Sequence, residues 1–284
     1  MAVGQRQLAA FAETHLTNVP FDVSPRYLAG PGDARHVTHA LAAVGRSCSS
    51  DPLSPQVVLT SPERDARLSL NPLSASLPCW RVEGHPVDGP YWWAAFDELV
   101  PAEIIAGLTD ALIPGRSAGQ PDVRDVLAAA DWTVTGRNGQ VSSAHSPDDM
   151  VSVEFHDDST ETFSWRIEAR ARPGEGPALW AIRLQGQTPA PMVSGLFTAL
   201  ASSEPVQRAM SDRTAHYSAP KEPSPLQPQQ VVAAHTNRLA RLRSQARAQR
   251  RRQHAAPDRP AAGLPTPGRQ APRPYQVTRP KDPS

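Results

Sequence analysis

Residues 101–112, PAEIIAGLTDAL, return 88 positions later as residues 189–200, PAPMVSGLFTAL, with six of the twelve residues identical. Four further blocks recur in one order upstream of these segments, at offsets between 85 and 87 residues. The pairs are WRVE at 80–83 with WRIE at 165–168, Gly89, Pro90 and Trp93 with Gly176, Pro177 and Trp180, Ser61 and Pro62 with Ser146 and Pro147, and Val37 and Leu41 with Val123 and Leu127. Matching blocks in a constant order indicate an internal duplication, which therefore organises the fold.

The spacing of apolar residues is the same in both copies. Intervals of three and four residues predict a helix that opens each copy, near residues 37–44 and 123–130. A period of two, interrupted by tight turns, then predicts antiparallel strands, and a helix that begins at proline closes each copy at 101–112 and 189–200. The sequence therefore predicts an α+β fold of two tandem repeats, each a helix, a four- to five-stranded antiparallel sheet and a helix, which can dock pseudo-symmetrically.

This pattern divides the chain into four segments. Residues 1–22 form an N-terminal segment with a short amphipathic helix, residues 23–115 form the first repeat, and residues 119–212 form the second. The remaining residues, 213–284, are rich in proline and arginine, since 12 of the 31 prolines lie in the last 69 positions. Such a composition does not support a buried core, so we expect a disordered basic tail with one helix-prone island.

Charge is divided in the same way. The net charge of the whole chain is only +1, from 29 basic and 28 acidic residues. Residues 216–284 contain 13 Lys or Arg and 3 Asp or Glu, a net of +10, which leaves 16 basic and 25 acidic residues, a net of −9, for residues 1–215. The near-neutral total therefore combines an acidic body with a basic tail.

The helix-prone island of the tail, residues 231–253, contains no Gly, no Pro and no acidic residue. Its basic residues are Arg238, Arg241, Arg243, Arg247, Arg250, Arg251 and Arg252. On a helix they leave only a narrow stripe with Leu239 and Leu242, so we expect the island to lie outside the body and to be largely unfolded alone through self-repulsion. Neutralisation by phosphate removes that penalty, which favours non-specific contact with nucleic acid. An electrostatic clamp on an acidic surface of this chain or of another protein is the alternative, and a solvating tail is the simplest interpretation.

Several other classes of protein are disfavoured. The chain has no run of about 20 apolar residues that could cross a membrane, and Glu13 interrupts its N-terminal apolar patch, so we expect a cytoplasmic protein that does not bind membranes. Cys48 and Cys79 lack metal-binding spacing and are expected to be buried thiols. Phosphate-loop, dinucleotide-binding and nucleophile-elbow motifs do not occur. We therefore expect no catalytic residue, no metal site and no cofactor.

Two histidines are candidates for a metal site. His36 and His39 are neighbours on the first predicted helix, a spacing that allows two imidazoles to share an ion. In the second copy Asp122 and Asp125 occupy the same places. Positions that accept either residue type are typical of a solvated helix face, which is the interpretation we adopt.

The alternation of side chains along a strand divides the aromatic residues into inward-facing and outward-facing ones. Four tryptophans recur at matched positions in apolar strands, which favours the core over a stacking platform: Trp80, Trp93, Trp165 and Trp180. If Trp93 faces inward, then Trp92 faces outward, because successive residues of a strand point to opposite faces. We therefore predict that Tyr91 and Trp92 form a partner-binding surface.

Three stretches resemble a known family. SPRYLAGPG at 24–32, GPYWW at 89–93, and PAEI at 101–104 followed by an Ala-Gly-Leu helix, are similar to the actinobacterial family called domain of unknown function 317. The resemblance covers residues 24–208 and implies two tandem copies of one domain. The family has no assigned activity, so the resemblance bears on the fold and not on a function.

A duplicated scaffold without a duplicated set of acids, bases or nucleophiles indicates binding rather than catalysis. We therefore expect a non-enzymatic binding or adaptor protein, in which the α+β body binds an unidentified protein partner and the Arg-rich tail contacts nucleic acid. One alternative is a chaperone-like client-binding protein whose basic tail clamps an acidic surface. Another is an enzyme of unrecognised type, which requires a pocket with convergent titratable groups. A homodimer is compatible with each of these.

Overall fold

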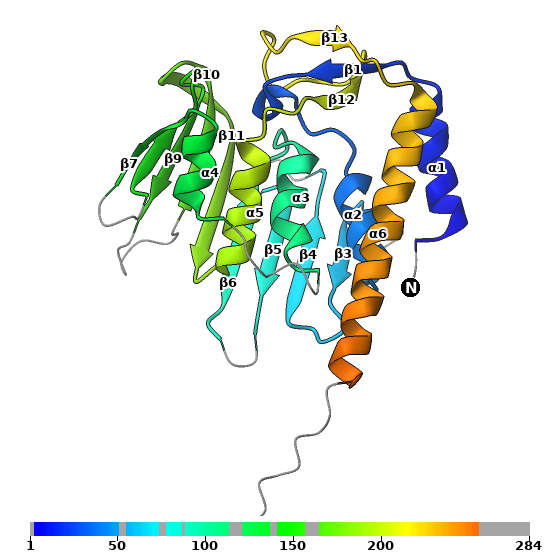
Figure 1. Ribbon diagram of the computed structural model, residues 1–284. Helices are drawn as coiled ribbons and strands as arrows, with labels where there is room; N and C mark the ends of the chain where they lie inside the picture. The colour runs from blue at the N-terminus through cyan, green and yellow to red at the C-terminus, as the bar shows by residue number, and fades with distance from the viewer. Residues whose placement is uncertain are drawn as a thin grey trace, which may run out of the picture.

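The computed structural model shows both repeats within one continuous sheet (Figure 1). The residues that the structure describes are 3–50, 55–73, 78–86, 89–113, 121–136, 141–156 and 165–255. The part of the predicted tail at 256–284 lies outside the described residues.

Both copies run through the same order of elements, a helix, five strands and a second helix. In the first copy these are α2 (Arg35–Ala43), β2 (Ser47–Ser50), β3 (Val57–Thr60), β4 (Ala66–Leu70), β5 (Trp80–Gly84), β6 (Trp92–Phe96) and α3 (Ala102–Asp110). In the second copy they are α4 (Val123–Ala129), β7 (Thr133–Thr135), β8 (Ser143–His145), β9 (Val151–Phe155), β10 (Trp165–Arg172), β11 (Glu175–Gly186) and α5 (Ala190–Leu200). The predicted α+β repeat is confirmed.

The two repeats share one antiparallel sheet of ten strands, in the order β2-β3-β4-β5-β6-β11-β10-β9-β8-β7. The last strands of the two copies, β6 and β11, pair at its centre, with Phe96 opposite Ile182 and Trp92 opposite Gly186. Outward from this pair, the strands of each copy follow in the same sequence to the edge. The copies are therefore related by an approximate two-fold axis through the middle of the sheet.

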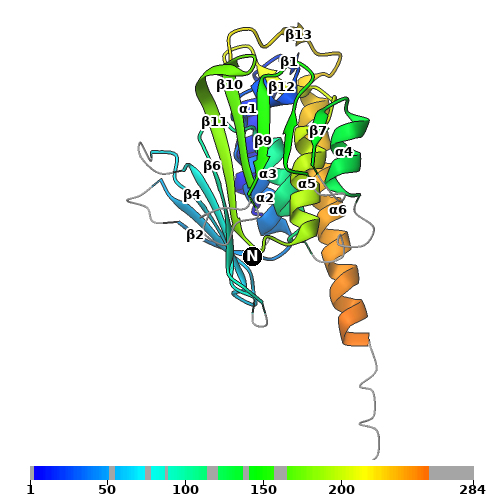
Figure 2. The same cartoon turned by 90° about the vertical axis from the view of Figure 1, so that its left-hand side faces the viewer.

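Helices from both copies cover one face of the sheet (Figure 2). At the centre of this layer α3 and α5 lie side by side, and a glycine of each helix allows the close approach. A Cβ atom built on Gly107 would lie 2.4 Å from the carbonyl oxygen of Gly195, and one on Gly195 would lie 2.3 Å from that of Gly107. Both glycines belong to the repeated block at 101–112 and 189–200, so the duplication supplies both halves of the contact.

The register of the strands decides which tryptophans reach the core. Phe96 pairs with Trp80, the first residue of β5, and Leu184 pairs with Trp165, the first residue of β10. The strands β6 and β11 therefore correspond at an offset of 88 residues. Trp92, and not Trp93, is therefore the counterpart of Trp180, and these two side chains are 3% and 1% exposed. The prediction that Trp92 faces outward is wrong, because an offset of 87 shifts the strand by one residue and exchanges its two faces.

Elements outside the repeats lie beside α2 and across the upper edge of the helix layer in Figure 1. They are α1 (Gln5–Leu16), β1 (Pro20–Val23), the 3-10 helix η1 (Arg26–Leu28), β12 (Val206–Ala209), β13 (Lys221–Pro223) and α6 (Pro228–Ala255). The short strands form a second sheet in the order β12-β1-β13. The N-terminal helix expected within residues 1–22 is present as α1.

The described part of the predicted tail is folded. β13 lies in the small sheet, and α6 packs against α1 and α2. The stripe of Leu239 and Leu242, extended by Ala246, is buried in a small apolar cluster with Ala40 and Val44 of the first repeat. The prediction of a disordered segment outside the body is therefore wrong for residues 213–252, because one-sided burial of this stripe, with ion pairing, outweighs the repulsion between arginines.

Candidate functional site

The arginines of α6 divide between two faces of the helix. Three of them contact the body or are partly buried against it: Arg238, Arg243 and Arg250. The other four are exposed, as is Arg250 despite its contact with the body, and we call these four the arginine face: Arg241, Arg247, Arg251 and Arg252. Because α6 contains no acidic residue, the arginine face is not neutralised from within its own helix.

Two arginines fix α6 to the first repeat. Arg238 places Nη2 2.8 Å from Oδ1 of Asp110, and its Nη1 donates to the carbonyl of His36 at 2.8 Å. Arg250 donates from Nη2 to the carbonyl of Val44, the C-cap residue of α2, at 2.8 Å. An ion pair that is largely shielded from water is screened by salt less than a pair on the surface. The contact between α6 and the body therefore combines apolar burial with directional hydrogen bonds.

The third body-facing arginine is less well accommodated. Arg243 buries its Nε and Nη2 atoms, and neither has a hydrogen-bond partner among the described residues. A buried polar nitrogen without a partner costs free energy. Arg243 is therefore a weak point of the interface.

Three histidines line the same interface. The ring of His235 on α6 stacks on Phe11 with centroids 3.9 Å apart, and its Nε2 lies 3.2 Å from Nδ1 of His39. Burial, and after it the neighbouring His39, His36 and Arg238, lowers the pKa of His235 to about 3. Burial also lowers the pKa values of His36 and His39, so all three rings are neutral at pH 7.

The interpretation of His36 and His39 as a solvated face is therefore wrong, because α1 and α6 cover α2. His39 is buried, and His36 is half-buried. Within the described ranges, no group of three or more His, Cys, Asp or Glu side chains is placed to hold a metal ion.

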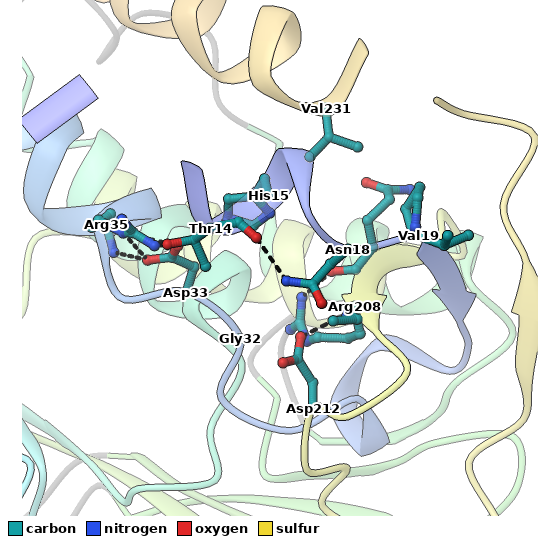
Figure 3. Close-up of a pocket in the computed structure, with 13 residues that line it drawn as sticks. Thr14, His15, Asn18, Val19, Gly32, Asp33, Arg35, Arg208, Asp212 and Val231 are labelled. Atoms are coloured by element: carbon teal, nitrogen blue, oxygen red, sulfur yellow. Dashed lines mark hydrogen bonds and ion pairs between the residues drawn. The ribbon is translucent and has the colours of Figure 1, made fainter. Parts of the chain in front are cut away.

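A polar cleft of about 290 Å³ opens between α1, the loop before α2, β12 and the start of α6 (Figure 3). At the loop, Asp33 lies 2.7 Å from Nη2 of Arg35 and 3.0 Å from Nε2 of His15. Burial alone raises the pKa of Asp33, but hydrogen bonds from His15 and Arg35 outweigh it and hold that pKa well below its usual range. At β12, Arg208 makes two hydrogen bonds of 2.8 Å to the carboxylate of Glu103. Sequence reasoning missed this pair, because 105 positions separate its members.

Titratable groups converge on this cleft, and most of them are paired, while the carboxylate of Asp212 accepts a hydrogen bond from the backbone N–H of Ala209. Asp33 is paired with His15 and Arg35, and Arg208 is paired with Glu103. Among the residues that line the cleft, Thr14 carries a hydroxyl group, which donates to a backbone carbonyl of its own helix. The geometry therefore offers acids and bases without an activated nucleophile, and it fits a structural joint between α1, α3 and β12.

The predicted partner-binding residues lie at the start of β6. Tyr91 is 44% exposed, with its ring centroid 4.6 Å from that of His85, and its hydroxyl accepts a hydrogen bond from Arg81 at 3.2 Å. The guanidinium of Arg81 also lies over Trp93, 4.6 Å from the ring centroid. The cluster at this surface is thus formed by the exposed Tyr91 and His85 with the half-buried Arg81 and Trp93, while Trp92 is buried in the core.

The prediction that both cysteines are buried holds for one of them. Cys79 is buried as expected, whereas Cys48, on the edge strand β2, is exposed. Among the helices of the described residues, none is long and apolar enough to cross a membrane.

Comparison with known proteins identifies part of each repeat. Residues 60–118 and 145–206 match the SPDY domain of unknown function (DUF317). The first match includes β4 to β6 with α3, and the second includes β9 to β11 with α5, which are corresponding parts of the two copies. No curated protein and no solved structure matches the chain. Each repeat therefore contains a segment that is similar to the DUF317 domain, in the tandem arrangement of two copies.

Proposed function

We propose that this protein is a cytoplasmic, non-enzymatic binding protein whose arginine face contacts the phosphate backbone of nucleic acid. The observation that supports the proposal is that four exposed arginines lie on one helix without any acidic residue. Guanidinium groups bind phosphate through charge-assisted hydrogen bonds, and such contacts carry no information about base sequence. We therefore expect binding with little sequence preference.

Packing against the body prepares α6 for this role. Like charges three and four residues apart weaken an isolated helix, and α6 has seven arginines within its 28 residues. The buried leucine stripe and the pair between Arg238 and Asp110 hold the helix before it meets a ligand. Less conformational entropy is then lost on binding than with an unfolded tail.

The charge of the rest of the chain restricts where phosphate can bind. Residues 1–215 carry a net charge of −9, from 16 basic and 25 acidic residues. An acidic surface repels a polyanion, so contact is favoured at the arginine face alone.

The test is the salt dependence of binding to a random DNA duplex, measured by fluorescence anisotropy. If the four exposed arginines each neutralise one phosphate, the affinity of the full chain falls roughly 100-fold between 50 and 200 mM salt. Replacement of these four arginines by glutamine is expected to remove most of the binding and to flatten the response to salt. The affected residues are Arg241, Arg247, Arg251 and Arg252.

A matched control removes the same charge elsewhere. Four arginines outside α6 are also exposed: Arg64, Arg67, Arg172 and Arg213. Their joint replacement by glutamine is expected to leave most of the affinity intact. Equal losses in the two quadruple variants, or a wild-type affinity that does not respond to salt, would contradict the proposal.

A second candidate is a client-binding protein whose basic helix clamps an acidic surface. The ion pair between Arg238 and Asp110 favours it, because α6 already contacts an acidic residue of its own body. The exposed cluster around Tyr91 is the surface at which such a client is expected. Recovery of a stoichiometric protein client after nuclease treatment, and loss of that client in Tyr91→Ala, supports this candidate over nucleic-acid binding.

A further inference from the structure

The approximate two-fold axis relates α2 of the first repeat to α4 of the second. Leu41 and Leu127 correspond at an offset of 86 residues, and both are fully buried beneath their helices. The same offset defines two matching flanks on the outer sides of these helices. The α2 flank consists of His36, His39, Ala40, Ala43 and Val44, and the α4 flank consists of Asp122, Asp125, Val126, Ala129 and Ala130.

The two flanks differ in what covers them. Ala40, Ala43 and Val44 of the α2 flank are buried in the apolar cluster that contains the leucine stripe of α6. On the α4 flank, Asp125 and Ala129 are exposed. Figure 1 shows α6 beside α2 at one end of the helix layer and α4 at the opposite end. One helix position of the repeat therefore has a helical neighbour in the first copy and presents exposed residues in the second.

The two flanks also differ in charge. Asp122 and Asp125 stand where the α2 flank has two neutral histidines, and Asp131, just after α4, is exposed as well. Arg124 is the single basic residue between positions 121 and 136. The α4 flank therefore presents the exposed Ala129, beside Val126 and Ala130 that are half-buried against the main core, within an acidic frame whose charge is complementary to a basic helix.

We propose that the α4 flank binds an arginine- or lysine-rich amphipathic helix of a partner protein, in the way that the α2 flank holds α6. Helices that bind in this manner place an apolar stripe on the receiving surface. Ala129 and Ala130 have small side chains, so such a stripe can approach the α4 backbone closely. The basic residues beside the stripe then meet the carboxylates of Asp122, Asp125 and Asp131.

A partner protein is favoured over a second copy of this chain. The α6 of a second copy already buries Leu239, Leu242 and Ala246 against its own first repeat. Transfer of that helix to the α4 flank exposes the small cluster it leaves, so the exchange gains little apolar burial. A helix from another protein has no such cost.

The test uses a fluorescein-labelled peptide with the sequence of residues 228–255, whose leucine stripe and arginines match the chemistry expected of the partner helix. It is titrated into the full-length protein at low salt and followed by anisotropy. We expect one peptide to bind per chain, with an affinity that falls as salt rises. Ala129→Arg places bulk and like charge in the middle of the flank and is expected to weaken binding by roughly tenfold or more.

Ala128→Arg is the matched control. Ala128 is exposed on the same helix, but consecutive helical residues lie about 100° apart, so it points away from the middle of the flank. We expect this variant to bind the peptide as the wild type does. Circular dichroism and thermal melting check that both variants are folded, and Asp125→Arg provides a second substitution on the flank if Ala129→Arg does not fold.

Three outcomes overturn the proposal. The first is no binding of the peptide by the wild type. The second is equal binding by the wild type and Ala129→Arg, which shows that the peptide exchanges with α6 or binds elsewhere. The third is a wild-type dimer in light scattering that Ala129→Arg converts to a monomer, which assigns the flank to a second copy of the chain. Weaker binding by Ala129→Arg alone, with a monomeric wild type, supports a partner helix.

Discussion

Removal of the Arg208 side chain is expected to be the most destabilising single change at the junction between the small sheet and the repeats. Arg208 is on β12, its side chain is 2% exposed, and it donates to both carboxylate oxygens of Glu103 in the first turn of α3. It also donates to the carbonyls of Ala29, Gly30 and Gln207 at 3.2, 3.0 and 2.9 Å. One guanidinium therefore joins β12, the loop before α2 and the start of α3.

The size of the effect follows from what Arg208→Met leaves behind. The side chain of Glu103 is 19% exposed, and burial alone raises the pKa of its carboxyl group. The charge of Arg208 and its hydrogen bonds outweigh burial and lower that pKa to about 2. Without the arginine the carboxylate stays largely shielded from water and loses its partner, and breaking a buried pair in this way typically costs about 3 to 5 kcal/mol. Methionine retains much of the aliphatic contact, so the change isolates the polar part.

Urea denaturation measures this loss. With an m value of about 3 kcal/mol per molar urea, the midpoint of Arg208→Met is expected to fall by about 1 to 2 M. The double variant Glu103→Gln with Arg208→Met removes both charges, so its loss is expected to be smaller than the sum of the single losses by about 1 kcal/mol or more. Arg213→Met is the control, since Arg213 and Glu98 lie 3.6 Å apart with side chains 67% and 64% exposed. A loss below about 1 kcal/mol in Arg208→Met, or additive losses in the double variant, refutes the reasoning.

Three further changes test other parts of the structure. Gly107→Val is expected to lower stability by about 1 to 3 kcal/mol, because a side chain there collides with the backbone of α5, and urea melts detect this loss. The pKa of His235 is lower in the folded state than in the unfolded state, where it is about 6.5. The contribution of this residue to stability is therefore complete above about pH 6.5 and is lost as the pH falls towards 3. Thermal melting of His235→Gln is expected to show a weaker dependence on pH over this range. Trp92→Ala is expected to cost about 3 to 5 kcal/mol and Trp93→Ala less than about 1 kcal/mol, a difference that reverses if Trp93 is the core residue.

The tryptophans of β6 show what a local sequence pattern can predict and where it fails. The blocks around Trp93 and Trp180 align at an offset of 87, whereas the following helices align at 88. Both offsets fit the sequence, but they place opposite sides of β6 in the core. The offset of 88 residues between the helices is the signal that identifies Trp92 as the counterpart of Trp180. The pairing of β6 with β5 and β11 confirms this offset.

The arginine-rich helix α6 shows a second limit of prediction from the sequence. Its helical character follows from an uninterrupted run without glycine or proline, and that prediction is confirmed. Its position beside α2 depends on Leu239 and Leu242 meeting apolar residues almost 200 positions earlier, and on the meeting of Arg238 with Asp110. A count of charges predicts repulsion between the arginines. It does not show that the narrow apolar stripe of α6 can pack against a complementary surface.

The sequence by itself determined the duplication, the α+β class and the order of elements within each copy. Recurring blocks and periods of two and 3.6 residues are properties of neighbouring positions, so they can be identified without a fold. Only the tertiary structure decided that β6 and β11 join the copies into one sheet, that Trp92 is buried, and that α6 packs on the first repeat while Asp125 and Ala129 of the second repeat are exposed. These outcomes depend on which distant surfaces meet, and the free energy of such contacts is set by burial and charge pairing in three dimensions.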